Sequence, residues 1–325
     1  MARLFLLAVL LAALAVLAVG VGSAGLPLAD VVAALRGAAD EPTRVIVWEL
    51  RLPRIALAAL AGGALALAGA VFQALLRNPL ADPYVLGVSG GAAVGAVLAL
   101  ALGLPQTSSV ALPVAALAGA LGATALVFRI ASAPGRALDT RVLLLAGVIA
   151  GAFFNAVILL LLTFASAETF RSAIFWMMGS LSGTGWRAPL ALAAAVLPAS
   201  AALVALARPL NLLAIGEDTA LYLGTRVERV KIAAYFLASL LVAGAVAAAG
   251  VIGFIGLVVP HALRLVWGGD HRLLLPASLL GGGAFLIAAD TLARSATEAM
   301  ELPVGVVTAL IGVPVFALLL RRSLA

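Results

Sequence analysis

The sequence contains no cysteine, only two histidines and a single lysine among its 325 residues. The lack of cysteine excludes disulfides, thiolate catalysis and cysteine-based metal sites, and two histidines are too few for a histidine-rich metal or haem site. Charged residues make up 10% of the chain, whereas soluble domains carry about 25%. With 65% hydrophobic residues and a mean hydropathy of +1.22, the chain cannot be a water-soluble globule. The net charge of +6 comes from basic residues scattered singly between apolar runs. This distribution favours a role in membrane orientation over nucleic-acid binding.

Eight long stretches of the chain contain no Asp, Glu, Lys or Arg. They are 4–29, 55–76, 83–128, 142–167, 188–207, 232–263, 273–289 and 302–320. A spanning helix needs about 20 residues, so six of the stretches predict one helix each. The stretches 83–128 and 232–263 are long enough for two, with breaks predicted at 103–109 and at the glycines of 250–256. The sequence therefore predicts an all-α polytopic membrane protein with about ten transmembrane helices in one domain, 1–325. A short apolar segment, 172–186, is predicted to lie partly inserted near the interface.

The distribution of basic residues predicts how these helices are oriented. With ten spans and an inside N-terminus, thirteen of the twenty Lys and Arg residues, Arg136 among them, fall in inside connections. Cytoplasmic connections carry the excess of positive charge, so both termini are predicted to be cytoplasmic. An alternative stays open for the first stretch. Arg3, an apolar run and the small residues of 22–25 also resemble a cleavable signal peptide, whose loss would leave nine spans.

Close helix packing is predicted wherever small residues recur at four-residue spacing, because they let backbones approach each other in lipid. Such glycines are Gly87, Gly91 and Gly95, Gly147 and Gly151, and the runs 62–63 and 281–283. Packing is the favoured interpretation of each, and a direct role in substrate binding the less favoured one.

Ionisable residues inside membrane spans often mark proton or ion paths, and here they are almost absent. Asp290 is the one carboxylate inside a clear span, and Arg294 follows at the i+4 position, which predicts an ion pair on one helix face. The alternative is a stand-alone secondary transporter or channel that uses Asp290 as a proton relay. Such a carrier would need more ionisable groups, so the energy is predicted to come from elsewhere.

The chain also has no means of hydrolysing ATP. Its only lysine, Lys231, is not part of the Gly-Lys-Ser/Thr sequence of a phosphate-binding loop. A membrane-embedded enzyme is disfavoured as well, because His261 has no accompanying cluster of Ser, Asp or Glu. Neither His261 nor His271 is predicted to ligate haem, since both map to the cytoplasmic side.

Three connections are informative. The outside connection 30–54 presents Arg51 and Arg54, with Pro53 predicted to start the next helix. Two guanidinium groups suit a carboxylate on a protein partner, although lipid-headgroup contact is an alternative.

The inside turn 77–91 contains two prolines and then a glycine-rich helix start. The inside connection 208–231 predicts a short helix at 216–223, with acidic residues in its first turn and Gly224 as its end. Its apolar residues have no membrane to face, which predicts a docking surface for another protein.

Several strings resemble the FecCD permeases, the transmembrane subunits of type II ABC importers for iron-siderophores, haem and vitamin B12. They are RLPR (51–54), RNPLADPYVLGVSGGA (77–92), LLLAGV (143–148), LAIGEDTALYLG (213–224), GFIGLVVPHALR (253–264), DHRLLLP (270–276) and ELPVGVVTALIGVPVF (301–316). The resemblance covers nearly the whole chain in order.

The resemblance implies the type II ABC importer permease fold and an ATP-driven, alternating-access import of a metal chelate in the bacterial inner membrane. It implies a homodimer, two separate ATP-binding subunits that carry ATP and Mg, a periplasmic binding protein, and no cofactor, metal or nucleic acid bound by this chain. The pathway would follow the fifth span, about 142–165. The implied ATPase-coupling residues are Gly216, Glu217, Asp218, Ala220, Leu221, Leu223 and Gly224. The implied binding-protein docking residues are Arg51, Arg54 and Arg294, and the implied cytoplasmic gate residues are Asn78, Leu80, Thr140 and Arg141. Where the vitamin B12 permeases have a serine-rich turn, this chain has Asp139 and Arg141.

Overall fold

The computed structural model describes residues 2–22, 25–132, 138–296 and 301–324, and Arg136 therefore lies outside the described residues. These parts of the chain are helical, with no strand among them. The first half contains α1 (Ala2–Gly20), α2 (Leu28–Leu35), α3 (Glu41–Val45), the π-helix η1 (Ile46–Arg51), α4 (Leu52–Leu75), the 3₁₀ turn η2 (Pro83–Leu86), α5 (Val88–Ala101), α6 (Leu104–Thr107), α7 (Ala111–Ala131) and α8 (Thr140–Thr163). The second half contains α9 (Ala167–Met177), α10 (Arg187–Ala205), α11 (Ala207–Ile215), α12 (Glu217–Tyr222), α13 (Val227–Ala249), α14 (Ile255–Trp267), α15 (His271–Ser295) and α16 (Val304–Leu324).

The apolar helices agree with the predicted spans. Among the described residues, seven helical segments are long and apolar enough to cross a membrane, namely α1, the continuous segment Glu41–Leu75, α7, α8, α10, α13 and α15. Three shorter apolar helices, α5, α14 and α16, correspond to the other predicted spans. Both predicted breaks are confirmed: α5 and α7 are separated at 102–110, and α13 and α14 at 250–254.

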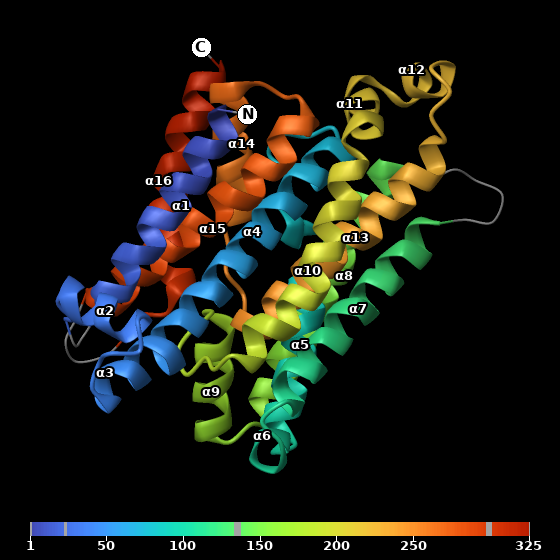
Figure 1. Cartoon of the computed structure of the whole chain (residues 1–325). Helices are drawn as coiled ribbons and strands as arrows, with labels where there is room; N and C mark the ends of the chain where they lie inside the picture. Colours follow the sequence, from blue (N-terminus) through green and yellow to red (C-terminus); the bar gives the residue numbers. More distant parts are fainter. Residues whose placement is uncertain (1, 23–24, 133–137, 297–300, 325) are drawn as a thin grey trace.

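Helix α4 is the centre of the bundle, where it packs most extensively against α15 and also against α13 (Figure 1). Nearly every residue of α4 beyond Leu60 is buried. Gly62 of α4 and Gly282 of α15 explain the close approach, because a Cβ on either would overlap the backbone carbonyl of the other. Gly91 of α5 meets Gly119 of α7 in the same way. Glycine packing is thus confirmed at these positions, whereas Gly151 has nothing within 4 Å of an added Cβ.

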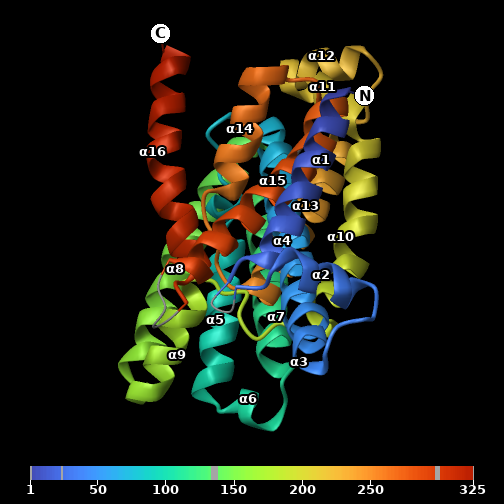
Figure 2. The same ribbon diagram turned by 60° about the vertical axis from the view of Figure 1, so that its left-hand side comes forward.

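The bundle has two distinct ends, which Figures 1 and 2 show in two orientations. Helices α11 and α12 lie at one end, together with the start of α1 and the end of α16; this is called the α12 end below. Helices α2, α3, α6 and α9 lie at the opposite end, called the α2 end. Both chain termini therefore approach the α12 end, as the predicted even number of spans requires.

Two expectations about connections were wrong, and a third was incomplete. The segment 30–54 is not an open loop with a helix starting at Pro53, because α3, η1 and α4 run on as one helical segment. The π turn of η1 explains this, since local π geometry lets an apolar helix accommodate a proline that lacks an N–H. The segment 172–186 is helical only to Met177, where α9 ends. The connection 208–231 contains a second helix, α11, which was not predicted.

Candidate functional site

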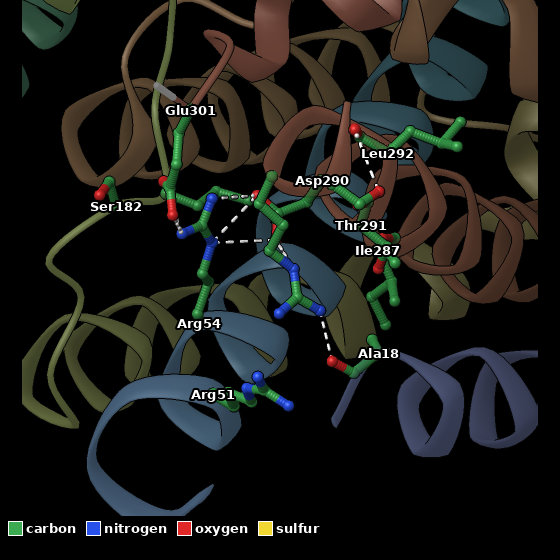
Figure 3. A network of polar contacts seen from close by, with 12 residues as sticks. Ala18, Arg51, Arg54, Ser182, Ile287, Asp290, Thr291, Leu292 and Glu301 are labelled. Atoms are coloured by element: carbon green, nitrogen blue, oxygen red, sulfur yellow. Dashed lines mark hydrogen bonds and ion pairs between the residues drawn. The ribbon is translucent and has the colours of Figure 1, made fainter. Parts of the chain in front are cut away.

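A network of buried charges lies at the α2 end, between α4 and α15 (Figure 3). The Arg54 guanidinium donates to both carboxylate oxygens of Asp290, at 2.9 Å to Oδ1 and 3.0 Å to Oδ2. A third nitrogen of Arg54, Nη1, donates to Glu301 Oε2 at 2.8 Å. The predicted pair of Asp290 with Arg294 is confirmed at 3.6 Å. Asp290 thus has two cationic partners. Arg54 was not predicted as one, because it lies far from Asp290 in the sequence.

The same network holds the last turn of α1. Arg294 Nη2 donates to the Ala18 carbonyl, and Arg51 Nη1 donates to the Val19 carbonyl. Both arginine side chains are buried, with 6% of each residue exposed. The final carbonyls of a helix have no intrahelical donor and carry partial negative charge, so two guanidinium groups suit this position. The last turn of helix α1 is therefore held against the bundle by these two contacts.

The structure brings the predicted docking residues Arg51, Arg54 and Arg294 together at one end, but it also places them in intramolecular contacts. Arg51 and Arg294 are buried, and only 12% of the Arg54 side chain is exposed. Glu301, with 43% of its side chain exposed, is the accessible member of the network. A partner's carboxylate that approached Arg54 would therefore meet Glu301 first. No sequence pattern predicts this contact beyond the position of Glu301 directly before the last predicted span.

At the opposite end, α12 forms a projecting helix with an apolar surface. Gly216 precedes it, and Gly224 ends it with a φ of 79°, its N–H donating to the Leu221 carbonyl at 2.9 Å. The predicted helix end at Gly224 is confirmed. Leu221 is 57% exposed, Leu223 63% and Tyr222 91%. Leu221 and Leu223 were predicted as contact residues of this surface, whereas Tyr222 was not.

Ala220 is the exception among the predicted contact residues of α12, because it is fully buried. It faces the core of the chain, so its small side chain serves packing and not an exposed contact. Glu217 and Asp218 belong to the first turn, where Glu217 is half-buried and Asp218 is exposed, and Glu217 has an internal partner.

That partner is Lys231, whose side chain is 1% exposed. Its Nζ lies 2.8 Å from Glu217 Oε2 and 3.5 Å from Glu228 Oε2, and it also donates to the Leu138 carbonyl. These partners of Lys231 were not predicted. A lone lysine in an apolar chain was a signal that it has buried anionic partners.

The predicted gate residues lie in two separate turns. Asn78 and Leu80 are exposed, and Asn78 Oδ1 accepts the Leu80 N–H at 3.0 Å. Thr140, the first residue of α8, is buried, whereas Arg141 is exposed. No described contact joins the two pairs. The segments that follow the two turns do make contact, because Gly147 of α8 packs against the backbone of Leu86 in η2.

Asp270 organises the start of α15 at the α12 end. Its Oδ1 accepts the Asn211 amide at 2.7 Å and the Arg272 N–H at 3.0 Å. The Asn211 amide, followed by the Arg272 N–H, holds the pKa of the Asp270 carboxyl below its usual range. Asp270 thereby links α11 to α15.

Helix α8 presents a wide apolar face that nothing in the described chain covers. Leu145, Ile149, Phe153 and Leu160 are all more than half exposed, and the amide side chain of Asn155 is exposed on the same helix. An apolar groove of about 510 Å³ between α9 and α16 adds to the uncovered surface. Neither surface carries a charged residue.

These features define a multi-pass membrane permease: a bundle of about ten apolar helices with a projecting helix at one end and a charged network at the other. The chain belongs to the FecCD transport family, whose pattern it matches over residues 10–322. The fold is that of a type II ABC importer permease, as predicted.

Three similar proteins illustrate the relationship. The cobalamin import system permease protein BtuC of Halobacterium salinarum is 48% identical over 308 residues, covering 94% of this chain and 82% of that protein. The vitamin B12 import system permease protein BtuC of Escherichia coli O139:H28 is 44% identical, covering 86% and 84%. A solved structure described as an inward-facing conformation of a metal-chelate type ABC transporter is 34% identical, with a TM-score of 0.86 and 98% of both chains covered. The chain is thus a permease subunit of an ABC importer and not an enzyme.

Proposed function

We propose that this chain moves a metal chelate from a periplasmic binding protein to the cytoplasm by alternating access, as one half of a homodimer. Two separate ATP-binding subunits supply the energy and hold the ATP and Mg, and this chain binds no cofactor. The observation that carries the proposal is the opposition of the two ends: α12 projects an apolar surface at one end, and the arginine network lies at the other.

The α12 end is the cytoplasmic side in this proposal, and the membrane is the bacterial inner membrane. Leu221, Tyr222 and Leu223 are exposed beyond the apolar spans. Exposed large apolar residues gathered on one projecting helix favour a protein partner. The ATP-binding subunit is that partner, because this chain has no nucleotide-binding loop of its own.

The second copy is proposed to face α8. Lipid favours apolar side chains but not the exposed amide of Asn155, because hydrocarbon offers no hydrogen-bond partner. A dimer axis along α8 places this amide in a protein contact or a water-filled pathway. The absence of charge on the face suits a bulky cargo, which must leave the pathway as easily as it enters.

The proposed cargo is a corrinoid, with iron-siderophores and haem as the other members of the chelate class. This choice rests on the two relatives named for cobalamin and vitamin B12, which are 48% and 44% identical to this chain. Uptake of cyanocobalamin into proteoliposomes, measured against a ferric siderophore and haem, tests the choice.

The rival function is a stand-alone secondary transporter or channel that uses Asp290. The geometry favours the ion pair, because Arg54 and Arg294 both face the Asp290 carboxylate. Two guanidinium groups hold this carboxylate in buried ion pairs, whereas a proton relay would have to break those contacts in every transport cycle.

Reconstitution with the ATP-binding subunit tests the proposed function. Leu221→Asp with Tyr222→Asp places two carboxylates on the α12 surface. The double variant should abolish co-purification with the ATPase and ATP-driven uptake while the fold persists, since both side chains are exposed. Tyr222→Phe is the matched control and should behave as the unsubstituted chain. Uptake without the ATPase, or with only a proton gradient, would contradict the proposal.

A further inference from the structure

The buried Lys231 lies where three elements meet at the α12 end. Glu217 comes from α12, Glu228 and Lys231 itself from the first two turns of α13, and Leu138 from the residues just before α8. The Lys231 ammonium contacts Glu217 Oε2 at 2.8 Å and donates to the Leu138 carbonyl. One side chain therefore joins the proposed docking helix to the start of the helix proposed to line the pathway.

The Leu138 peptide is held on both of its polar groups. Its carbonyl accepts from Lys231, and its N–H donates to Glu228 Oε1 at 2.7 Å. Leu138 is itself buried, with 2% exposed. Asp139 then caps α8 by accepting the Arg141 N–H at 2.8 Å. The N-terminal end of α8 is thereby fixed to α13 through a continuous set of polar contacts.

This set of contacts connects α12 to α8, a helix that is not its neighbour in the sequence. Helix α12 packs against α11 and α13, so its route to α8 passes through α13. A buried ammonium cannot exchange its partners for water without a large cost. If α12 shifts beneath a moving partner, Lys231 must move with Glu217 and carry the Leu138 carbonyl along.

We propose that Lys231 is a positioning residue that transmits displacement of α12 to the N-terminal end of α8, and so to the predicted gate residues Thr140 and Arg141. This inference rests on the proposed function, because it needs an ATPase that docks on α12. The inference names Lys231 as the residue that connects docking of the ATPase on α12 with movement of the predicted gate residues on α8. Without Lys231, the ATPase still docks, but its motion reaches α8 weakly.

The test uses the full complex of two copies of this chain with the ATP-binding subunits in lipid. Because the chain lacks cysteine, Val142→Cys gives a single labelling site in each copy. Val142 is 42% exposed on the first turn of α8. The measurements are co-purification of the ATPase, the spin-label distance between the two copies with and without ATP and vanadate, and cargo transported per ATP hydrolysed.

Lys231→Met keeps the length of the side chain and removes its charge. We expect the ATPase still to co-purify, the ATP-dependent change in distance to shrink, and cargo transported per ATP to fall on the order of tenfold. Lys231→Arg retains a cation with donors and should restore both readouts toward the original values.

Tyr235→Phe is the matched control. Tyr235 lies one turn after Lys231 on α13, is fully buried, and donates to the Thr124 carbonyl of α7 at 2.9 Å. The variant therefore loses a buried polar contact that does not reach α12 or α8. A merely structural role for Lys231 predicts that both variants lower the melting temperature and leave the distance change and coupling intact, and that result would overturn the inference.

A second variant covers the case in which Lys231→Met does not fold. The Glu217 side chain is 29% exposed, so Glu217→Ala breaks the link between α12 and Lys231 while the contact of Lys231 with the Leu138 carbonyl remains. A reduced distance change with normal ATPase binding supports the inference, and an unchanged distance and coupling ratio contradict it. Failure of the unsubstituted chain to bind the ATPase is a different result, which would overturn the proposed function and this inference with it.

Discussion

At the scale of single residues, Asp290 compensates the positive charges of two arginines at a buried position. Its side chain is 3% exposed, and Arg54 and Arg294 both depend on it for charge compensation. Removing one partner of a buried ion pair typically costs about 3–5 kcal/mol. Asp290→Asn should therefore lower the stability of the folded chain by about 3 kcal/mol, measured as thermal unfolding in detergent or lipid.

The same variant separates the two candidate functions. The ABC importer predicts that Asp290→Asn protein which still folds retains ATP-driven uptake, whereas a proton-coupled carrier predicts loss of transport in well-folded protein. Glu301→Gln is the matched control, because this partner of Arg54 is 43% exposed and exposed pairs contribute about 1 kcal/mol or less. Equal destabilisation by the two variants would show that burial of the network is not what makes Asp290 important.

Asp270 predicts a pH dependence of stability. Its pKa is lowered by the Asn211 amide and the Arg272 N–H, so the ionised carboxylate is favoured in the folded chain. Its contribution is fully present above the unfolded pKa of about 3.9 and is lost as the pH falls through the lower, folded pKa. Asp270→Asn should cost about 1 kcal/mol or less at pH 7, because the group is exposed. Thermal unfolding should show this difference vanishing in acid; a difference that persists there would contradict an electrostatic origin.

At the scale of elements, the contact between α4 and α15 depends on glycine. An added Cβ at Gly62 overlaps the Gly282 carbonyl, and overpacking of this kind typically costs about 1–3 kcal/mol. Gly62→Ala should lower the melting temperature of the chain accordingly. Gly122→Ala on α7 is the control, since nothing lies within 4 Å of its added Cβ. It should leave stability unchanged or raise it slightly, as alanine favours a helix. Destabilisation by Gly122→Ala alone would refute the role of the close contact.

The elements also show which features a sequence of this composition can predict. Long runs without charged residues predict the membrane spans directly, because the length of an apolar run is a local property of the sequence. Gly250 and Gly224 end helices as predicted, because the backbone freedom of glycine is local as well. The helical continuity through Pro53 was missed, because the π geometry that accommodates the proline has no simple sequence pattern. The partners of Arg54 were missed for a different reason. Asp290 lies 236 residues from Arg54 in the sequence, and only the packed bundle brings such charges together.

At the scale of the whole molecule, the uncovered face of α8 predicts where two copies meet. Because the chain lacks cysteine, single cysteines placed along α8 can report this contact by oxidative cross-linking in native membranes. Substitutions at exposed positions such as Leu145, Ile149, Phe153 and Leu160 should give a cross-linked dimer at one or more sites with helical periodicity. Leu17→Cys on α1 is the control, since Leu17 is similarly exposed at 61% but lies on a helix that packs against α15, away from the α8 face. Cross-linking through Leu17, with none along α8, would place the partner copy on a different face and remove the proposed pathway from the dimer axis.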